Sequence, residues 1–212
     1  MNEEAVRAAV VAERTDLAEM LGGLRPEQWA APTLCAGWRV REVLAHMTMA
    51  FRMSVPQFLL GMVKARGDFN RMADRQARAD TTRFSDADLL AQLRDNVAHN
   101  WKPPGGGLIG ALSHDVIHGL DISVGLGLDR RVPPERVGLI LAGMQPKNVS
   151  YFGTDLTGVR LEAADLDWTY GTGEPLRGAA QDLLLVVSGR RLPAGLLDGP
   201  AAGRFARRDA EV

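Results

Sequence analysis

The sequence predicts a mainly α-helical protein, with a helical bundle over about residues 1–150 and a small α+β unit over residues 151–212. A length of 212 residues corresponds to one large domain with a small appendage, at roughly 150 residues per domain. Four segments repeat apolar residues at helical spacing, which favours a bundle of four helices. Beyond about Tyr151 the pattern changes to the alternation of a strand.

The composition is that of an ordinary globular protein. Hydrophobic residues make up 46% and charged residues 24%, against averages of roughly 45–50% and 25%. The formal charge of −1 offers no basic surface for nucleic acid or for a membrane. The single cysteine, Cys35, cannot form an internal disulfide. We therefore expect a cytoplasmic protein with small-molecule partners and no membrane span.

The four bundle helices follow from periodicity and from the breaks between them. In the first, Val6, Val10 and Leu17 recur at intervals of four and seven residues. Glycine and proline residues separate this segment from the next ones. The helices are expected at residues 3–21, at 38–61 with a bend near Pro56, from Ser85 to about 101, and at 108–122.

The C-terminal part reads as a strand and helix unit. A fifth helix is expected after Pro133 and Pro134, with an uncertain end. Within residues 158–170, Leu166, Trp168 and Tyr170 alternate as in a strand, and the 171–173 turn follows. Pro175 is expected near the start of an apolar helix that ends before Gly189.

Three histidines could carry chemistry. His114 and His118 stand one turn apart on the fourth helix, so both side chains leave the same face. His46 lies in the middle of the second helix among apolar residues, where a buried imidazole needs a partner. Three neutral imidazoles that converge would leave a coordination position open, as in a catalytic zinc site. The alternative is that these histidines are solvated or satisfied within the core.

Several acidic and polar neighbours bear on this interpretation. Asp121 continues the histidine stripe and could orient a ligand imidazole. Asp115 is rotated away and is expected to be a surface or helix-contact charge. Glu42 precedes His46 by one turn. It could be a fourth metal ligand, accept a hydrogen bond from a ligand imidazole, or form a salt bridge on the helix surface. His99 is expected to interact with carbonyl groups at a helix end.

Three ordered motifs resemble the mycothiol-dependent maleylpyruvate isomerase family, a branch of the DinB-like metalloprotein superfamily. The segment Thr33–His46 is similar to the family pattern C-x-G-W-x-V-R-[DE]-x-x-A-H. The segment His114–Ile122 resembles the E-x-x-x-H-x-x-D block of the last bundle helix, and Trp168–Arg190 resembles the C-terminal region. The similarity covers nearly the whole chain and implies a DinB-like four-helix bundle.

The resemblance implies a ligand set of His46, His114 and His118 for a divalent metal. Zinc is favoured, with nickel or iron as alternatives. The family pattern has a glutamate where this chain has His114, so the triad matches the three-histidine version of other DinB-like proteins. Three neutral ligands leave the ion a net charge of two plus, which favours a bound thiolate. The thiol would be mycothiol, which actinobacteria use.

Thiol transfer or isomerisation is the reaction that this resemblance implies. The thiolate would attack a small electrophile. Elimination after a bond rotation gives isomerisation, and a persistent adduct gives S-transfer, which we favour because the isomerase ligand set is not reproduced. The alternatives are a hydrolase that uses metal-bound water and a non-catalytic metal- or ligand-binding protein. A homodimer is left open.

Further residues have a role in these hypotheses. Cys35 is the rival nucleophile, although its position before the second helix favours a packing role. Trp38 is expected to anchor the loop to the bundle. Arg177 and Arg190 could bind carboxylates of the substrate or of the thiol cofactor, since guanidinium matches carboxylate geometry. The alternative for both arginines is a solvated surface position.

Overall fold

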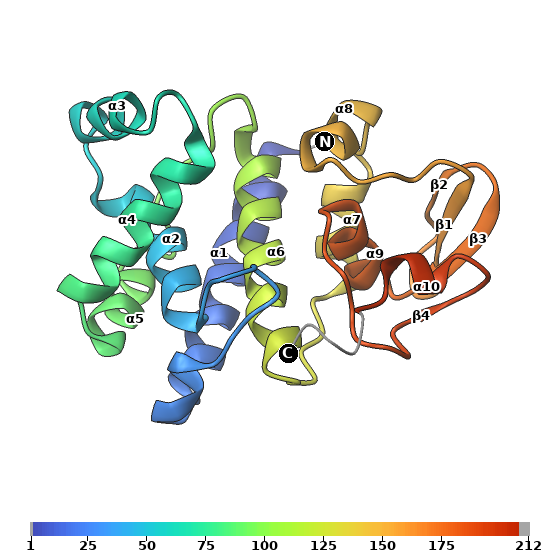
Figure 1. Ribbon diagram of the computed structural model, residues 1–212, viewed down its shortest axis with the longest axis horizontal. Helices are drawn as coiled ribbons and strands as arrows, with labels where there is room; N and C mark the ends of the chain where they lie inside the picture. The colour runs from blue at the N-terminus through green and yellow to red at the C-terminus, as the bar shows by residue number, and fades with distance from the viewer. Residues whose placement is uncertain (1, 208–212) are drawn as a thin grey trace. The chain divides into compact units, whose positions relative to one another are not determined.

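The computed structural model describes residues 2–207 and divides the chain into two compact units, Met1–Leu126 and Gly127–Val212. Within the described residues the protein is mainly helical and carries one small sheet, which confirms the predicted fold class (Figure 1). Residues 127–150, which the sequence pattern places in the helical bundle, lie in the second unit.

The first unit is a helical bundle with a large hydrophobic core. Helices α1 and α6 run side by side, and α2 packs against α4, α5 and α6 (Figure 1). The core draws Leu17 from α1, Val43 and Leu44 from α2, Leu89 from α5 and Ile122 from α6. The elements of this unit are α1 (Glu3–Gly22), the 3-10 helix η1 (Pro26–Ala30), α2 (Val40–Arg52), α3 (Val55–Lys64), α4 (Phe69–Arg83), α5 (Asp86–Arg94) and α6 (Gly107–Gly125).

The single helix predicted over residues 38–61 is two helices, α2 and α3. Helix α2 ends at Arg52, and α3 begins at Val55 with Pro56 in its first turn. Proline is tolerated there because the first N–H groups of a helix have no intrahelical acceptor. Ser54 and Gln57 form a capping box around the new start. Pro56 therefore starts a helix and does not bend one.

Helix α4 was not predicted, and α5 is shorter than predicted. Helix α4 buries Met72, Ala73 and Ala77 at helical spacing, but two of these are small and the rest of the helix is strongly polar. Ser85 caps α5 as expected, through its side chain and the N–H of Asp88. Helix α5 ends at Arg94, seven residues before the predicted end. Residues 95–98 form a turn, and residues 99–101 have no regular secondary structure.

The second unit contains α7 (Pro134–Leu141), α8 (Pro146–Phe152), α9 (Ala180–Val187), α10 (Ala202–Phe205) and four strands. The sheet order is β2-β1-β3-β4, with β1 (Val159–Ala163), β2 (Thr169–Gly171), β3 (Glu174–Gly178) and β4 (Leu197–Asp198). Strand β1 pairs parallel to β3, and the other two pairings are antiparallel. Pro175 lies in β3 and not at the start of α9, so that expectation was wrong.

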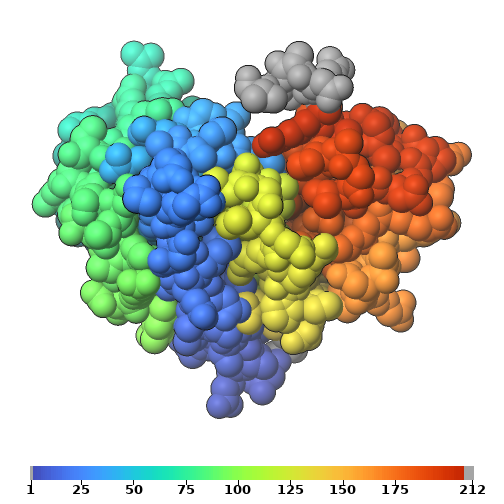
Figure 2. Space-filling view, turned by 90° about the horizontal axis from the view of Figure 1, so that it is seen from below, coloured from blue at the N-terminus to red at the C-terminus, as the bar shows by residue number. Residues whose placement is uncertain are grey.

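The surface of the first unit is formed in part by α1. Figure 2 shows the blue surface of α1 beside the green surface of the segment that contains α5, in agreement with the packing of these two helices. Across residues 2–207, none of the helices combines the length and the apolar character that crossing a lipid bilayer requires.

Candidate metal centre

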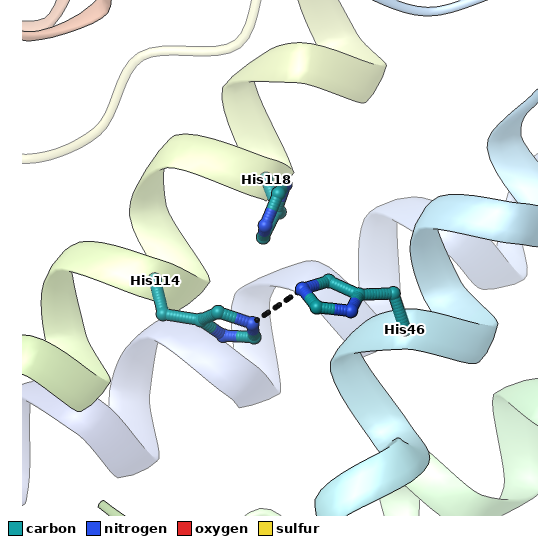
Figure 3. Close-up of side chains that lie close together, drawn as sticks. All are labelled: His46, His114 and His118. Atoms are coloured by element: carbon teal, nitrogen blue, oxygen red, sulfur yellow. Dashed lines mark hydrogen bonds between the residues drawn. The ribbon is translucent and has the colours of Figure 1, made fainter. Parts of the chain in front are cut away.

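Three histidines converge between α2 and α6, and we call His46, His114 and His118 the histidine centre. Each offers a ring nitrogen, and these nitrogens all lie within 4.8 Å of one another. Figure 3 shows His46 reaching from α2 toward the two imidazoles on α6. The Nε2 atoms of His46 and His114 are 3.2 Å apart. The one-turn spacing of His114 and His118 places both rings on the side of α6 that meets α2.

Both α6 imidazoles are held by a carboxylate from their own helix. The Nδ1 of His114 lies 2.9 Å from Oδ1 of Asp115. The Nδ1 of His118 lies 3.0 Å from Oδ2 of Asp121. We assign the ring proton to Nδ1 in both cases, because a carboxylate accepts and does not donate. Each ring then keeps its Nε2 lone pair for a ligand.

His46 differs because no residue in the range 2–207 forms a hydrogen bond with its buried Nδ1. Burial holds the pKa of His46 well below its usual value of 6.5, and the neighbouring His118 and His114 act in the same direction, against Asp121. The imidazole is therefore neutral near pH 7. A neutral ring is the form that binds metal ions.

The donor set fits a divalent transition metal. Two nitrogen ligands of one tetrahedral zinc ion, each about 2.0–2.1 Å from it, lie about 3.3 Å apart. The separation of 3.2 Å between the Nε2 atoms of His46 and His114 agrees with this spacing. Carboxylates that orient ligand imidazoles are usual around such ions. Imidazole nitrogens suit zinc, nickel and iron alike, so the donor set favours a class of ions and not one member.

A loop before α2 brings Cys35 to the second carboxylate. A Cβ at Gly125 would meet the Cα of Thr33 at 2.7 Å, so only glycine allows this close approach of the loop to the end of α6. The N–H of Leu34 donates to the carbonyl of Asp121 at 3.0 Å. The Cys35 thiol donates to Oδ2 of Asp121 at 3.0 Å. Cys35 thus lies behind His118, 3.7 Å from its Nδ1.

Two tryptophans lie against the histidine centre. The Trp38 ring is 5.1 Å from that of His46, and the Trp101 ring is 5.1 Å from that of His114, measured between centroids. The indole N–H of Trp38 donates to Asp74 of α4 at 2.8 Å, so Trp38 anchors its loop as expected. Indole rings reduce the water around a cluster of polar groups, which strengthens its electrostatic interactions.

Asp115 is not rotated away from the histidines, so that expectation was wrong. Its side chain is 3% exposed, and its two oxygens bind His114 and Arg14. The helix contact expected for Asp115 is present, because Arg14 belongs to α1. Residues one position apart differ in direction by about 100°. That offset still allows contact, because Asp115 binds His114 through one oxygen and Arg14 of α1 through the other.

Glu42 and His99 have other partners. Glu42 accepts hydrogen bonds from the backbone N–H and the guanidinium of Arg39, which is the salt-bridge alternative. His99 accepts a hydrogen bond at its Nδ1 from the N–H of Trp101 at 3.0 Å. The ring therefore binds a backbone donor, and the expected contact with terminal carbonyls was wrong.

Arg14 was missed by the sequence interpretation. It is fully buried, and its Nε donates to Oδ2 of Asp115 at 2.7 Å. A signal was present, because Arg14 stands four residues after Val10 and three before Leu17, on the apolar stripe of the first helix. A charged residue at a core position of an amphipathic helix needs a buried partner.

Arg177 and Arg190 both belong to the second unit. Arg177 donates to Oε2 of Glu162 at 2.7 Å on the surface of the sheet. Arg190 donates to the carbonyl of Ser188 at 2.6 Å. Their role in binding carboxylates stays a prediction.

A comparison with family models relates the first unit to known proteins. Residues 10–101 match the mycothiol maleylpyruvate isomerase N-terminal domain. This range includes His46 and ends before α6, which carries His114 and His118. No curated protein sequence matches the chain significantly.

A comparison with solved structures extends the likeness of the fold. The crystal structure of the mycothiol-dependent maleylpyruvate isomerase is similar with a TM-score of 0.54 at 13% identity, over 95% of this chain and 94% of the other. A crystal structure of a histidine-to-alanine mutant of that isomerase is similar with a TM-score of 0.50 at 12% identity, over the same shares. The chain therefore has the fold of these crystal structures, and the match of its residues 10–101 to the N-terminal domain of mycothiol maleylpyruvate isomerase confirms the family resemblance of the segment Thr33–His46.

Proposed function

We propose that this protein binds a divalent metal, with zinc favoured, through His46, His114 and His118, and uses mycothiol in thiol transfer or isomerisation of a small electrophile. The observation that carries the proposal is the convergence of three imidazole nitrogens within 4.8 Å. Two of the imidazoles are oriented by carboxylates. The match of residues 10–101 to a mycothiol maleylpyruvate isomerase domain supports the choice of thiol.

The chemistry that a divalent ion supplies when held by these residues is Lewis acidity, which favours the thiolate form of a thiol near neutral pH. The protein contributes neutral ligands, because the pKa of His46 is lowered by burial. Asp115 and Asp121 keep the ring protons of His114 and His118 on Nδ1, away from the converging nitrogens. Neutral ligands leave the positive charge of the ion to be balanced by an anion.

Thiol transfer is the favoured reaction within this proposal. The family pattern has a glutamate at the position of His114, so the charge of the ligand set differs from that of the isomerases by one unit. A metal site with one more unit of positive charge would hold a thiolate more tightly. This would change the balance between attack of the thiolate on the electrophile and elimination of the thiol from the adduct. The electrophile is a small molecule whose identity the reaction assay must establish.

Metal content and thiol binding test the proposal directly. We expect one metal ion per chain in the parent protein by elemental mass spectrometry, and its loss in His46→Ala, His114→Ala and His118→Ala. Arg41→Met is the control, because Arg41 binds Asp86 and two backbone carbonyls and does not contact the histidine centre. A mycothiol titration of the metal-loaded protein should give saturable binding.

Each outcome decides between the alternatives. A parent protein that retains neither zinc nor nickel after reloading refutes the metal site. Full metal occupancy without thiol binding favours the non-catalytic binding protein. Turnover that is independent of mycothiol favours the hydrolase.

A further inference from the structure

We infer that Arg14 is a positioning residue for His114, which it fixes from two sides. On one side Arg14 binds the Asp115 carboxylate, which binds the His114 ring. On the other side it binds the segment that carries Trp101, whose indole packs against the same ring. The inference rests on the proposed function only in treating His114 as a ligand. Arg14 itself lies on α1, and the structure gives it no contact with the converging nitrogens.

The first side is the Asp115 carboxylate. Arg14 binds one oxygen, Oδ2, at 2.7 Å, and His114 binds the other, Oδ1, at 2.9 Å. With Oδ2 held by a cation from another helix, the carboxylate plane cannot turn without breaking a buried charge-assisted hydrogen bond. Oδ1 therefore stays aimed at His114, and this keeps the ring proton on Nδ1 and the lone pair on Nε2.

The second side is the segment between α5 and α6. The Nη1 of Arg14 donates to the carbonyl of His99 at 2.7 Å. The guanidinium also lies over the Phe51 ring, 5.2 Å from its centroid, and that ring packs on the His99 ring at 4.9 Å. His99 in turn accepts the N–H of Trp101, whose indole lies 5.1 Å from the His114 ring. The contacts form a closed circuit that begins and ends at Arg14.

A purely structural ion pair explains this arrangement less well. Replacing a buried ion pair by apolar residues of similar volume is often neutral or stabilising, and Arg14 occupies a core position where an apolar side chain would pack. Within residues 2–207, its buried Nη2 has no hydrogen-bond partner. The guanidinium fork binds in two directions at once, which a lysine ammonium does not reproduce. The pair is thus better explained by what it orients.

The test compares Arg14→Lys and Arg14→Met with a matched control. Arg41 is the control because it has the same kind of partners, a carboxylate (Asp86, 3.1 Å) and two backbone carbonyls, and it links α2 to α4 and α5 without contacting the histidine centre. The first measurement is the imidazole ¹⁵N NMR spectrum of the metal-free proteins, which reports the tautomer of His114. The second is the zinc dissociation constant, from competition with a chelator.

We expect the ¹⁵N resonances of His114 to move toward a mixture of tautomers in both Arg14 variants. The zinc dissociation constant should rise roughly 10- to 100-fold. Arg41→Met should leave the spectrum and the dissociation constant of the parent unchanged. If Arg14→Met does not fold, Arg14→Lys retains the charge and still removes the fork.

Unchanged His114 resonances and unchanged zinc affinity in the folded Arg14 variants would overturn the inference. Equal changes in Arg41→Met would also overturn it, because they would show a general loss of packing. The NMR measurement needs no metal. A parent protein that binds no zinc would therefore refute the proposed function while the tautomer of His114 still decides the role of Arg14.

Discussion

Helices α6 and α2 contribute to the histidine centre in different ways. Each imidazole on α6 has a carboxylate at its Nδ1, Asp115 for His114 and Asp121 for His118. The imidazole on α2, His46, has no hydrogen-bond partner at its Nδ1 among residues 2–207. The α6 rings are thus oriented by carboxylates of their own helix, whereas the α2 ring is buried and is paired through its Nε2 with the Nε2 of His114.

The two carboxylates differ as well. Asp115 shares its charge with a fully buried guanidinium from α1. Asp121 accepts a hydrogen bond from a thiol, Cys35, in the loop before α2. A charge-assisted hydrogen bond is about twice as strong as a neutral one. Asp115 thus binds a guanidinium from another helix, whereas Asp121 accepts hydrogen bonds from the Cys35 thiol and from His118.

Replacing each carboxylate by its amide gives the largest expected contrast. Asp115→Asn leaves Arg14 as an uncompensated buried charge and should lower the free energy of unfolding by about 3–5 kcal/mol. Asp121→Asn weakens the hydrogen bonds that this side chain accepts from His118 and Cys35 and should cost about 1–2 kcal/mol. Urea unfolding of the metal-free proteins at pH 7 measures both. Equal losses would show that the two sides do not differ in the way we describe.

The pH dependence of stability should distinguish His46. Its pKa in the folded protein lies well below 6.5 because the ring is buried. As the pH falls below about 6.5, the unfolded chain binds a proton that the folded protein does not, so the free energy of unfolding falls with pH. Between pH 7 and pH 5 the free energy of unfolding of the metal-free protein should therefore decrease.

Two variants isolate the contribution of His46. His46→Leu lacks this imidazole, so its free energy of unfolding should decrease less than that of the parent between pH 7 and pH 5. Arg41→Met should keep the dependence of the parent. Denaturant midpoints at several pH values provide the measurement, and identical profiles for the parent and His46→Leu would contradict the assignment.

The sequence predicted the α6 side of the centre better than the α2 side. The pair His114 and His118 and the continuation at Asp121 follow from helical spacing alone. The approach of His46 depends on how α2 packs against α6, 68 residues away in the chain from His114, and spacing within one helix carries no such information. The helical stripe gave the wrong direction for Asp115, because its partner Arg14 belongs to another helix.

The fold was predictable where apolar residues are large. Helix α6 repeats the large apolar residues Leu108, Leu112, Val116 and Leu120 at helical spacing, and its predicted limits agree closely with Gly107–Gly125. Helix α4 buries alanines and one methionine, so its periodicity is weak although Asp68 caps its start. The small strands β2 and β4 have three and two residues. Pairing with neighbouring strands defines them, and a single segment contains too few residues to reveal them.

Cys35 gives the smallest expected effect. Its thiol is one donor to Asp121, and Asp121 also receives the Nδ1–H of His118, so Cys35→Ala should lower the free energy of unfolding by about 0.5–1.5 kcal/mol. The zinc dissociation constant should rise by less than the tenfold minimum expected for Arg14→Met. Cys35→Ser restores a donor and should recover most of both losses. If Cys35→Ala keeps its metal and binds mycothiol but no longer turns over, Cys35 acts as a nucleophile, and the thiol behind His118 is then more than a weak support for Asp121.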